Sequence, residues 1–207
     1  MTITDAIKFM VAMIIMLNPL GSISIFLQLT KRSTKHRQIA KSTAVAIIII
    51  MLVTLWTGEE LLNLLGISIP SFRFAGGIIL LLMGLAMLQS RESPVSHTSE
   101  DDAAAKERES IAVVPMALPV IVGPGAISTM IIATGDYPRM LDRMTLSIIC
   151  IFLGIAVGAM LYYATSIFKL VGESVIKVVT RIMGMIIMAI AVGMLADGLI
   201  GLLPALH

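Results

Sequence analysis

The sequence predicts an all-α protein that crosses a lipid bilayer several times. Hydrophobic residues make up 57% of the 207-residue chain and charged residues only 14%, against about 25% charged in ordinary soluble domains. A soluble core of this size could not bury so much apolar surface. The net charge of +2 gives no bias toward polyanions. Composition therefore excludes a soluble globular enzyme, a disordered tail and a nucleic-acid-binding protein.

Six mostly apolar stretches have about the length that a helix needs to cross a hydrocarbon core of about 30 Å. They cover residues 5–29, 39–56, 71–89, 111–134, 144–165 and 179–203. Helices are predicted because lipid offers no hydrogen-bond partner to strand edges or bare backbone. The first stretch carries Asp5 as well as Lys8 and has no small-residue cleavage motif, so we interpret it as a retained span.

Lys and Arg residues concentrate in the loops after the first, third and fifth spans. This asymmetry predicts that these loops are cytoplasmic and that both termini lie on the opposite side. The loop 91–110 is polar and rich in acidic residues, Ser and Ala. We interpret it as a flexible cytoplasmic linker between two halves, residues 1–90 and 111–207.

The two halves resemble each other. Residues 72–79 match 180–187 at a constant offset, which aligns Arg73 with Arg181 and Gly76 with Gly184. Residues 19–24 match 124–128 at Pro, Gly, Ile and Ser once one gap is allowed. Three spans per half would make the second copy enter the membrane from the opposite side, so we predict two inverted three-helix repeats. Chance similarity between apolar segments is the alternative.

The first and fourth spans each contain a helix break, at 18–21 (Asn-Pro-Leu-Gly) and at 123–125 (Gly-Pro-Gly). Backbone groups freed at that depth must face protein, water or a ligand. Each half-helix that follows begins with unpaired N–H groups and a positive dipole end, which suits a carboxylate or phosphate. Carbonyls before each break could instead bind a small cation. Simple packing kinks are the alternative interpretation.

Two arginines and one aspartate lie inside or beside apolar spans. Arg73 is expected toward the outside and Arg181 toward the cytoplasm, each lining one mouth of a pathway; snorkelling to the interface is the alternative. Asp197 could pair with Arg73, carry a proton or lie at the interface. Glu59 and Glu60 are expected to be solvated. Seven glycines are assigned to helix packing: Gly76, Gly77, Gly84, Gly154, Gly158, Gly184 and Gly193.

Enzyme chemistry finds no support in the sequence. The three His residues lie in polar loops or at the C-terminus, and Cys150 is the only cysteine, so no metal-ligand set is expected. The predicted cofactor is none, with Na⁺ or H⁺ left open as a coupling ion. The predicted substrate-binding residues are Asn18, Pro19, Gly21, Ser22, Ser24, Arg73, Gly123, Pro124, Gly125, Ser128 and Arg181.

The two breaks and the six spans resemble the MarC family of bacterial inner-membrane proteins along essentially the full chain. The resemblance implies a multi-pass protein of the bacterial inner membrane. With the orientation predicted from Lys and Arg above, both termini are then expected to be periplasmic. Some members are grouped as small neutral amino-acid transporters, and the wider grouping includes exporters of the lysine-exporter type. A transport role and an amino-acid substrate are therefore what the resemblance implies.

The leading hypothesis is a secondary transporter of a small zwitterionic or anionic solute, held in a polar chamber between the two breaks. The alternatives are a translocase for a lipid phosphate, such as a polyprenyl phosphate, and a membrane assembly protein without transport. Expected partners are membrane lipid and a small-molecule solute, and no nucleic acid. Association with further copies of the chain is left open.

Overall fold

The computed structural model describes residues 1–31, 35–89 and 112–203, and the regular structure in these ranges is helical without strands. The predicted linker 91–110 lies outside the described residues. The elements are α1 (Ile3–Leu17), α2 (Pro19–Thr30), α3 (His36–Leu64), α4 (Ile69–Leu88), η1 (Ala112–Ile121), α6 (Pro124–Asp136), α7 (Met140–Tyr162), α8 (Ala164–Val171) and α9 (Glu173–Leu202).

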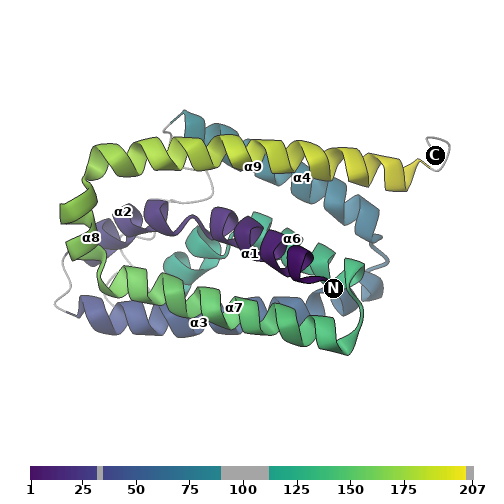
Figure 1. Cartoon of the computed structure of the whole chain (residues 1–207), viewed down its shortest axis with the longest axis horizontal. Helices are drawn as coiled ribbons and strands as arrows, with labels where there is room; N and C mark the ends of the chain where they lie inside the picture. The colour runs from purple at the N-terminus through teal and green to yellow at the C-terminus, as the bar shows by residue number, and fades with distance from the viewer. Residues whose placement is uncertain (32–34, 90–111, 204–207) are drawn as a thin grey trace.

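The helices form three layers (Figure 1). Helices α4 and α9 pack along each other on one side, and α3 and α7 do so on the other. The middle layer holds the two predicted broken spans, α1–α2 and η1–α6. In this layer α6 contacts α3 and α4, while α2 contacts α7 and α9. Each broken span is thus covered on both sides by long helices.

Successive spans run in alternating directions through the bundle, and α9 returns to the end where α1 begins (Figure 1). We name this the N-terminal end, and the opposite one the α8 end. Segment η1–α6 runs against α1–α2. The second helices of the two predicted halves, α3 and α7, pack together, and so do the third helices, α4 and α9. The inverted repeat itself stays a prediction.

Five helical segments in the described ranges are long and apolar enough to cross a membrane: Ile3–Thr30, His36–Leu64, Ile69–Leu88, Met140–Tyr162 and Glu173–Leu202. They correspond to five of the six predicted spans. The remaining one, 111–134, is divided into η1 and α6, of 10 and 13 residues. On α3 the exposed residues Val45, Ile49 and Val53 recur every fourth position, which gives one apolar stripe suited to lipid.

Glycines bring α4 and α9 into backbone contact. A Cβ atom on Gly184 would lie 2.9 Å from the carbonyl oxygen of Gly84, and one on Gly84 would lie 2.7 Å from the oxygen of Gly184. Such small residues are typical of helix interfaces in membranes. The prediction that these two glycines serve packing is confirmed. It is wrong for Gly193, where an added Cβ atom would have no neighbour within 4 Å among the described residues.

Two elements differ from the expected spans. Segment η1 is a π-helix that contains Pro115 and Pro119, and Val122 N donates to Ala117 O, five residues back, at 2.9 Å. Proline removes a backbone donor and clashes with the preceding turn, so regular α geometry is disfavoured there. The fifth span was expected to reach Thr165, but α7 ends at Tyr162 and the short helix α8 follows.

Candidate functional site

The first break is a single left-handed residue between α1 and α2. Asn18 has φ +40° and ψ +60°, a conformation that Asn adopts more readily than most residues. Its side-chain Oδ1 accepts from the backbone N–H of Gly21 at 3.4 Å, and Pro19 occupies the first position of α2. The predicted break of the first span is therefore confirmed, and Asn18 itself caps the half-helix.

The carbonyl groups released at this break have a partner within the chain. Ser22 is buried, and its hydroxyl donates to Asn18 O at 3.1 Å and to Leu17 O at 3.4 Å. These are the carbonyls that were predicted as cation ligands. In this conformation Ser22 satisfies them, whereas Ser24, one half-turn further along α2, is half-buried.

The second break separates η1 from α6. Gly123 is extended, with φ −79° and ψ 175°, and Pro124 takes the first position of α6. The Thr129 hydroxyl donates to Gly125 O at 2.9 Å, as expected for a hydroxyl four residues further along a helix. Ser128 is 2% exposed. The predicted interruption of the fourth span is confirmed.

The two breaks lie close together in the middle layer, and apolar side chains fill the space at Gly125. A Cβ atom on Gly125 would approach Leu80 of α4 and would lie 3.5 Å from Sδ of Met16, two residues before Asn18. Met16 and Leu80 are buried. The surroundings of Gly125 are thus apolar and tightly packed in this conformation, in contrast to the polar chamber that was expected between the breaks.

Ser128 faces α4. A Cβ atom on Gly76 would lie 2.8 Å from both Cβ and Oγ of Ser128, and 3.2 Å from Cε of Met194 on α9. Gly76 therefore leaves the room in which the Ser128 side chain lies. The structure brings together two of the residues that the sequence repeat singled out, one from each half.

Arg73 joins three helices at the N-terminal end. Its Nη2 donates to Oδ1 of Asp136 at 2.7 Å and to Oδ2 at 2.9 Å, and its Nη1 lies 3.7 Å from Oδ2 of Asp197. Of the alternatives left open for Asp197, the structure shows the pairing with Arg73. The main partner, Asp136, was missed; its position at the end of an apolar span is the signal that could have found it.

Arg181 lies on α9, in the part of the α4–α9 layer nearer the α8 end. It is exposed and lies eight residues into α9, about 12 Å along the helix from its start at the α8 end. Arg73 lies four residues into α4, which begins at the N-terminal end. The two arginines are thus near opposite ends of the bundle, as predicted, and neither lies at a helix break.

A second group of ion pairs joins α3 and α7 at the N-terminal end. Arg143 Nη2 lies 2.5 Å from Glu59 Oε2, and its Nη1 lies 3.1 Å from Glu60 Oε1. The terminal amine of Met1 contacts Asp142 at 2.7 Å. The expectation that Glu59 is solvated is wrong, because its side chain is only 20% exposed, whereas Glu60 is 59% exposed.

Charge is distributed unevenly between the two ends. Among the described acidic residues, only Glu173 belongs to the α8 end. The described basic residues of that end are Lys31, Lys35, Arg37, Lys41, Lys169, Lys177 and Arg181.

Tyr137 lies at the N-terminal end, in the connection between α6 and α7. Partial burial of its hydroxyl raises the pKa of Tyr137, and the nearby Asp5 carboxylate raises it further.

No group of three or more His, Cys, Asp or Glu side chains that could hold a metal ion occurs within the described ranges. A cavity of about 460 Å³ lies outside the middle layer, at the α8 end. It is lined by residues 35–38 at the start of α3 and by Tyr162, Tyr163, Thr165 and Ser166. Sequence reasoning did not predict this cavity, because its two walls are more than 120 residues apart in the chain.

Comparison with known proteins places the chain in a family. The sequence profile described as MarC family integral membrane protein matches residues 3–203. A UPF0056 membrane protein of Buchnera aphidicola is 34% identical over 203 residues, covering 97% of this chain and 94% of that protein. The UPF0056 membrane protein YhcE of Escherichia coli is 31% identical, covering 96% and 94%.

A third relative carries the family name. The UPF0056 inner membrane protein MarC of Salmonella arizonae is 28% identical over 210 residues, covering 96% of this chain and 95% of that protein. No solved structure matches the chain. The profile match over nearly the full length and the relatives above 30% identity show that this chain is a multi-pass integral membrane protein of the MarC family.

Proposed function

We propose that the protein is a secondary transporter of a small zwitterionic or anionic solute, for which a small neutral amino acid is the first candidate. The observation that carries the proposal is the pair of interrupted helices in the middle layer. A half-helix begins at each break, within the middle layer, and the two half-helices run in opposite directions. This arrangement is typical of transporters built from inverted repeats.

In the proposed mechanism the solute carboxylate binds at the starts of α2 and α6. The N–H groups there lack partners within the helix and carry the positive end of the helix dipole. Ser24 and Ser128 would add hydroxyl contacts, and the Asn18 amide would orient the amino group. Binding requires that the apolar contact between Met16, Leu80 and Gly125 opens, because these side chains fill the site in the described conformation.

The ion pairs at the N-terminal end support an alternating-access cycle. Arg73 connects α4 with α6 and α9, and Arg143 connects α7 with α3. Since α6 belongs to one predicted half and α4 to the other, separating the halves at this end would break the contact between Arg73 and Asp136. We therefore assign Arg73 to a barrier on the predicted periplasmic side rather than to direct solute binding.

The experiment is uptake of labelled glycine and alanine into proteoliposomes that contain the purified full-length protein, with Na⁺ and H⁺ gradients imposed in turn. Uptake above protein-free vesicles is expected for at least one substrate and gradient. Failure of every combination, with protein shown to be folded and inserted, would contradict the proposal.

Matched variants make the test specific to the breaks. Ser24→Ala removes a half-buried hydroxyl one turn into α2, and we expect it to lower uptake at limiting substrate by about tenfold, the effect of losing one hydrogen bond to a charged group. Thr145→Ala removes an exposed hydroxyl of α7 that bonds only its own helix and should transport normally. Equal rates for both variants would argue against a site at the break.

A further inference from the structure

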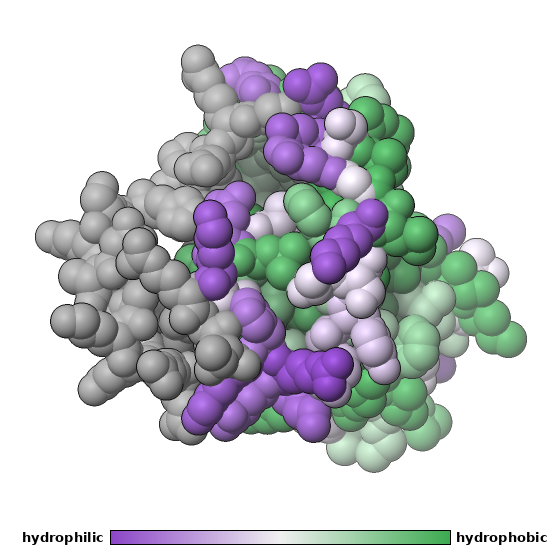
Figure 2. Space-filling view, turned by 90° about the vertical axis from the view of Figure 1, so that its left-hand side faces the viewer, coloured by the Kyte–Doolittle hydropathy of each residue, from purple (hydrophilic) through white to green (hydrophobic). Residues whose placement is uncertain are grey.

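The cavity at the α8 end combines a helix start, basic side chains and hydroxyl groups. Helix α3 begins there without a side-chain cap, and a helix of 29 residues places a positive dipole end at its first turn. Figure 2 looks onto this end and shows hydrophilic residues gathered across it, with apolar residues along the sides. The cavity therefore lies where the spans end, at the depth of the lipid headgroups.

Two cations converge on one tyrosine beside this cavity. The Cζ atom of Arg37 lies 5.0 Å from the ring centroid of Tyr162, and Nζ of Lys41 lies 5.9 Å from it. Arg37 and Lys41 are four residues apart on one face of α3, a spacing at which like charges repel. A tyrosine ring offsets only a small part of that repulsion, so this face of α3 favours an anion.

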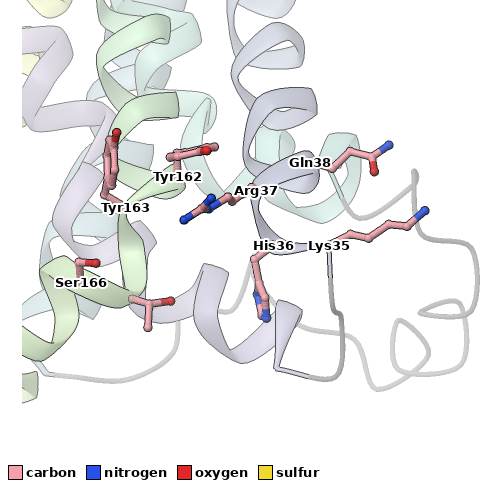
Figure 3. A pocket seen from close by; sticks show the side chains of 8 residues that line it. Lys35, His36, Arg37, Gln38, Tyr162, Tyr163 and Ser166 are labelled. Atoms are coloured by element: carbon pink, nitrogen blue, oxygen red, sulfur yellow. The ribbon is translucent and has the colours of Figure 1, made fainter.

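The described residues of the cavity lining supply donors and no negative charge. Its eight residues include no Asp or Glu. Nδ1 of His36 is buried and has no hydrogen-bond partner among the described residues. In Figure 3 the Arg37 side chain extends toward Tyr162, between α3 and the α7–α8 connection, while Lys35 and Gln38 extend away from the tyrosines. Arg37, His36 and the exposed hydroxyl of Ser166 are therefore the residues that could meet one ligand.

We propose that this cavity binds a phosphate group at the membrane interface, through Arg37, His36 and Ser166 of its lining, with Lys41 adding positive charge from beside Tyr162. Guanidinium and ammonium groups, hydroxyls and a helix start are the partners that proteins use for phosphate. Helix α8 fits a headgroup position, because Ile167 and Phe168 pack on the core while Ser166 and Lys169 are exposed. The phosphate can belong to a lipid or be free, and this site does not depend on the proposed transport.

The test measures ligand retention on the full-length protein in detergent. Phosphatidylglycerol and phosphatidylcholine are added at equal concentration, and bound lipid is counted by native mass spectrometry; inorganic phosphate is tested separately by its effect on the melting temperature. The test variant is Arg37→Gln with Lys41→Gln. The control, Lys31→Gln with Lys177→Gln, removes the same charge at the same end from residues that neither line the cavity nor lie over the Tyr162 ring.

A lipid site predicts that wild type and control retain phosphatidylglycerol over phosphatidylcholine, and that the test variant loses this retention by about tenfold or more. A site for free phosphate predicts no lipid preference, but a melting temperature that phosphate raises in wild type and control and not in the test variant.

Ser166→Ala is the second variant, because an exposed hydroxyl can be removed without disturbing the fold. It should weaken binding of the same ligand by about threefold, in line with the loss of one neutral hydrogen bond. If wild type, the double variant and Ser166→Ala all bind lipid and phosphate alike, the proposal is wrong. The same holds if the control variant loses as much binding as the test variant, since the effect would then be general surface charge.

Discussion

Asn18 is the residue on which the first helix break depends. It is the only described residue other than Gly with positive φ, and its side chain covers the start of α2 through Gly21. Asn fits both roles, because its short amide can cap a helix and because it tolerates the left-handed region. The break is therefore encoded locally, by Asn followed by Pro, and does not require a tertiary contact to form.

Substitution of Asn18 should separate these two roles. Asn18→Ala loses the cap and the side-chain amide whose local hydrogen bonding lets Asn adopt the left-handed region, which costs about 1–2 kcal/mol, whereas Asn18→Gly loses the cap but has no Cβ atom to clash in that region, and costs a few tenths of a kcal/mol. We expect the Ala variant to be clearly less stable than the Gly variant when both are unfolded in detergent mixtures and followed by circular dichroism. Equal stability would show that the left-handed conformation is not maintained in the folded protein.

Arg73 is the other residue with a defined effect. Asp136 is 50% exposed and Asp197 63% exposed, so solvent screens both contacts. A double-mutant cycle of Arg73→Gln and Asp136→Asn should give a coupling below about 1 kcal/mol, falling further at about 1 M salt. A coupling of several kcal/mol that salt does not change would instead indicate a buried ion pair.

At the scale of elements, the contact between α4 and α9 is the most extensive in the bundle. It depends on positions where a side chain would meet backbone. A Cβ atom on Gly184 would lie 2.9 Å from the carbonyl oxygen of Gly84. Backbone atoms cannot move aside as a flexible side chain can. The same helix carries Gly193, which faces open space.

These two glycines of α9 form a matched pair. Gly184→Ala should destabilise the protein by about 1–3 kcal/mol, since added atoms in a packed contact force a backbone shift. Gly193→Ala should be neutral or stabilising by up to about 1 kcal/mol, because Ala favours helix over Gly. Unfolding in detergent mixtures measures both. Comparable losses for the two variants would mean that α4 and α9 do not approach at Gly84.

At the scale of the molecule, the two ends differ in chemistry. The N-terminal end joins helices through Arg73 and Arg143, while the α8 end gathers basic residues around a cavity. By the excess of Lys and Arg, the α8 end is the predicted cytoplasmic side. The proposed barrier and the proposed phosphate site therefore lie at opposite ends of the molecule.

The orientation can be measured with single added cysteines, because the native Cys150 is buried. Leu65, in the connection between α3 and α4, is 61% exposed, and Leu170 of α8 is 88% exposed. In intact cells a membrane-impermeant maleimide should label Leu65→Cys and leave Leu170→Cys unlabelled, and both should react after permeabilisation. The reverse pattern would place the α8 end outside.

The spans and both breaks could be predicted from the sequence, because apolar length, Pro and Gly act within a few residues. The ends of the spans could not. The second span was expected to end at Trp56, but helix α3 continues to Leu64, because Glu and Leu favour helix and charged residues end an apolar stretch without ending a helix. Helix α8 was not predicted, because a helix of eight residues is too short to be recognised as a membrane span.

The candidate site divides in the same way. The identities of Asn18, Ser24 and Ser128 as residues near the breaks follow from the sequence alone. Their surroundings do not: Met16 and Leu80 approach Gly125 only because α1 and α4 pack on α6. The partner of Arg73 is likewise a matter of tertiary contact, since Asp136 lies 63 residues away in the chain.

What the sequence by itself determined is the membrane class, the helical spans and the two places where a helix must stop, because these depend on side-chain transfer free energy and local backbone sterics. Only the tertiary structure decided which helices lie together. It also decided that an Arg joins helices at one end, and that residues from α3 and α7–α8 line a basic cavity at the other end. Those features arise from contacts between distant segments, and no local pattern in the chain specifies such contacts.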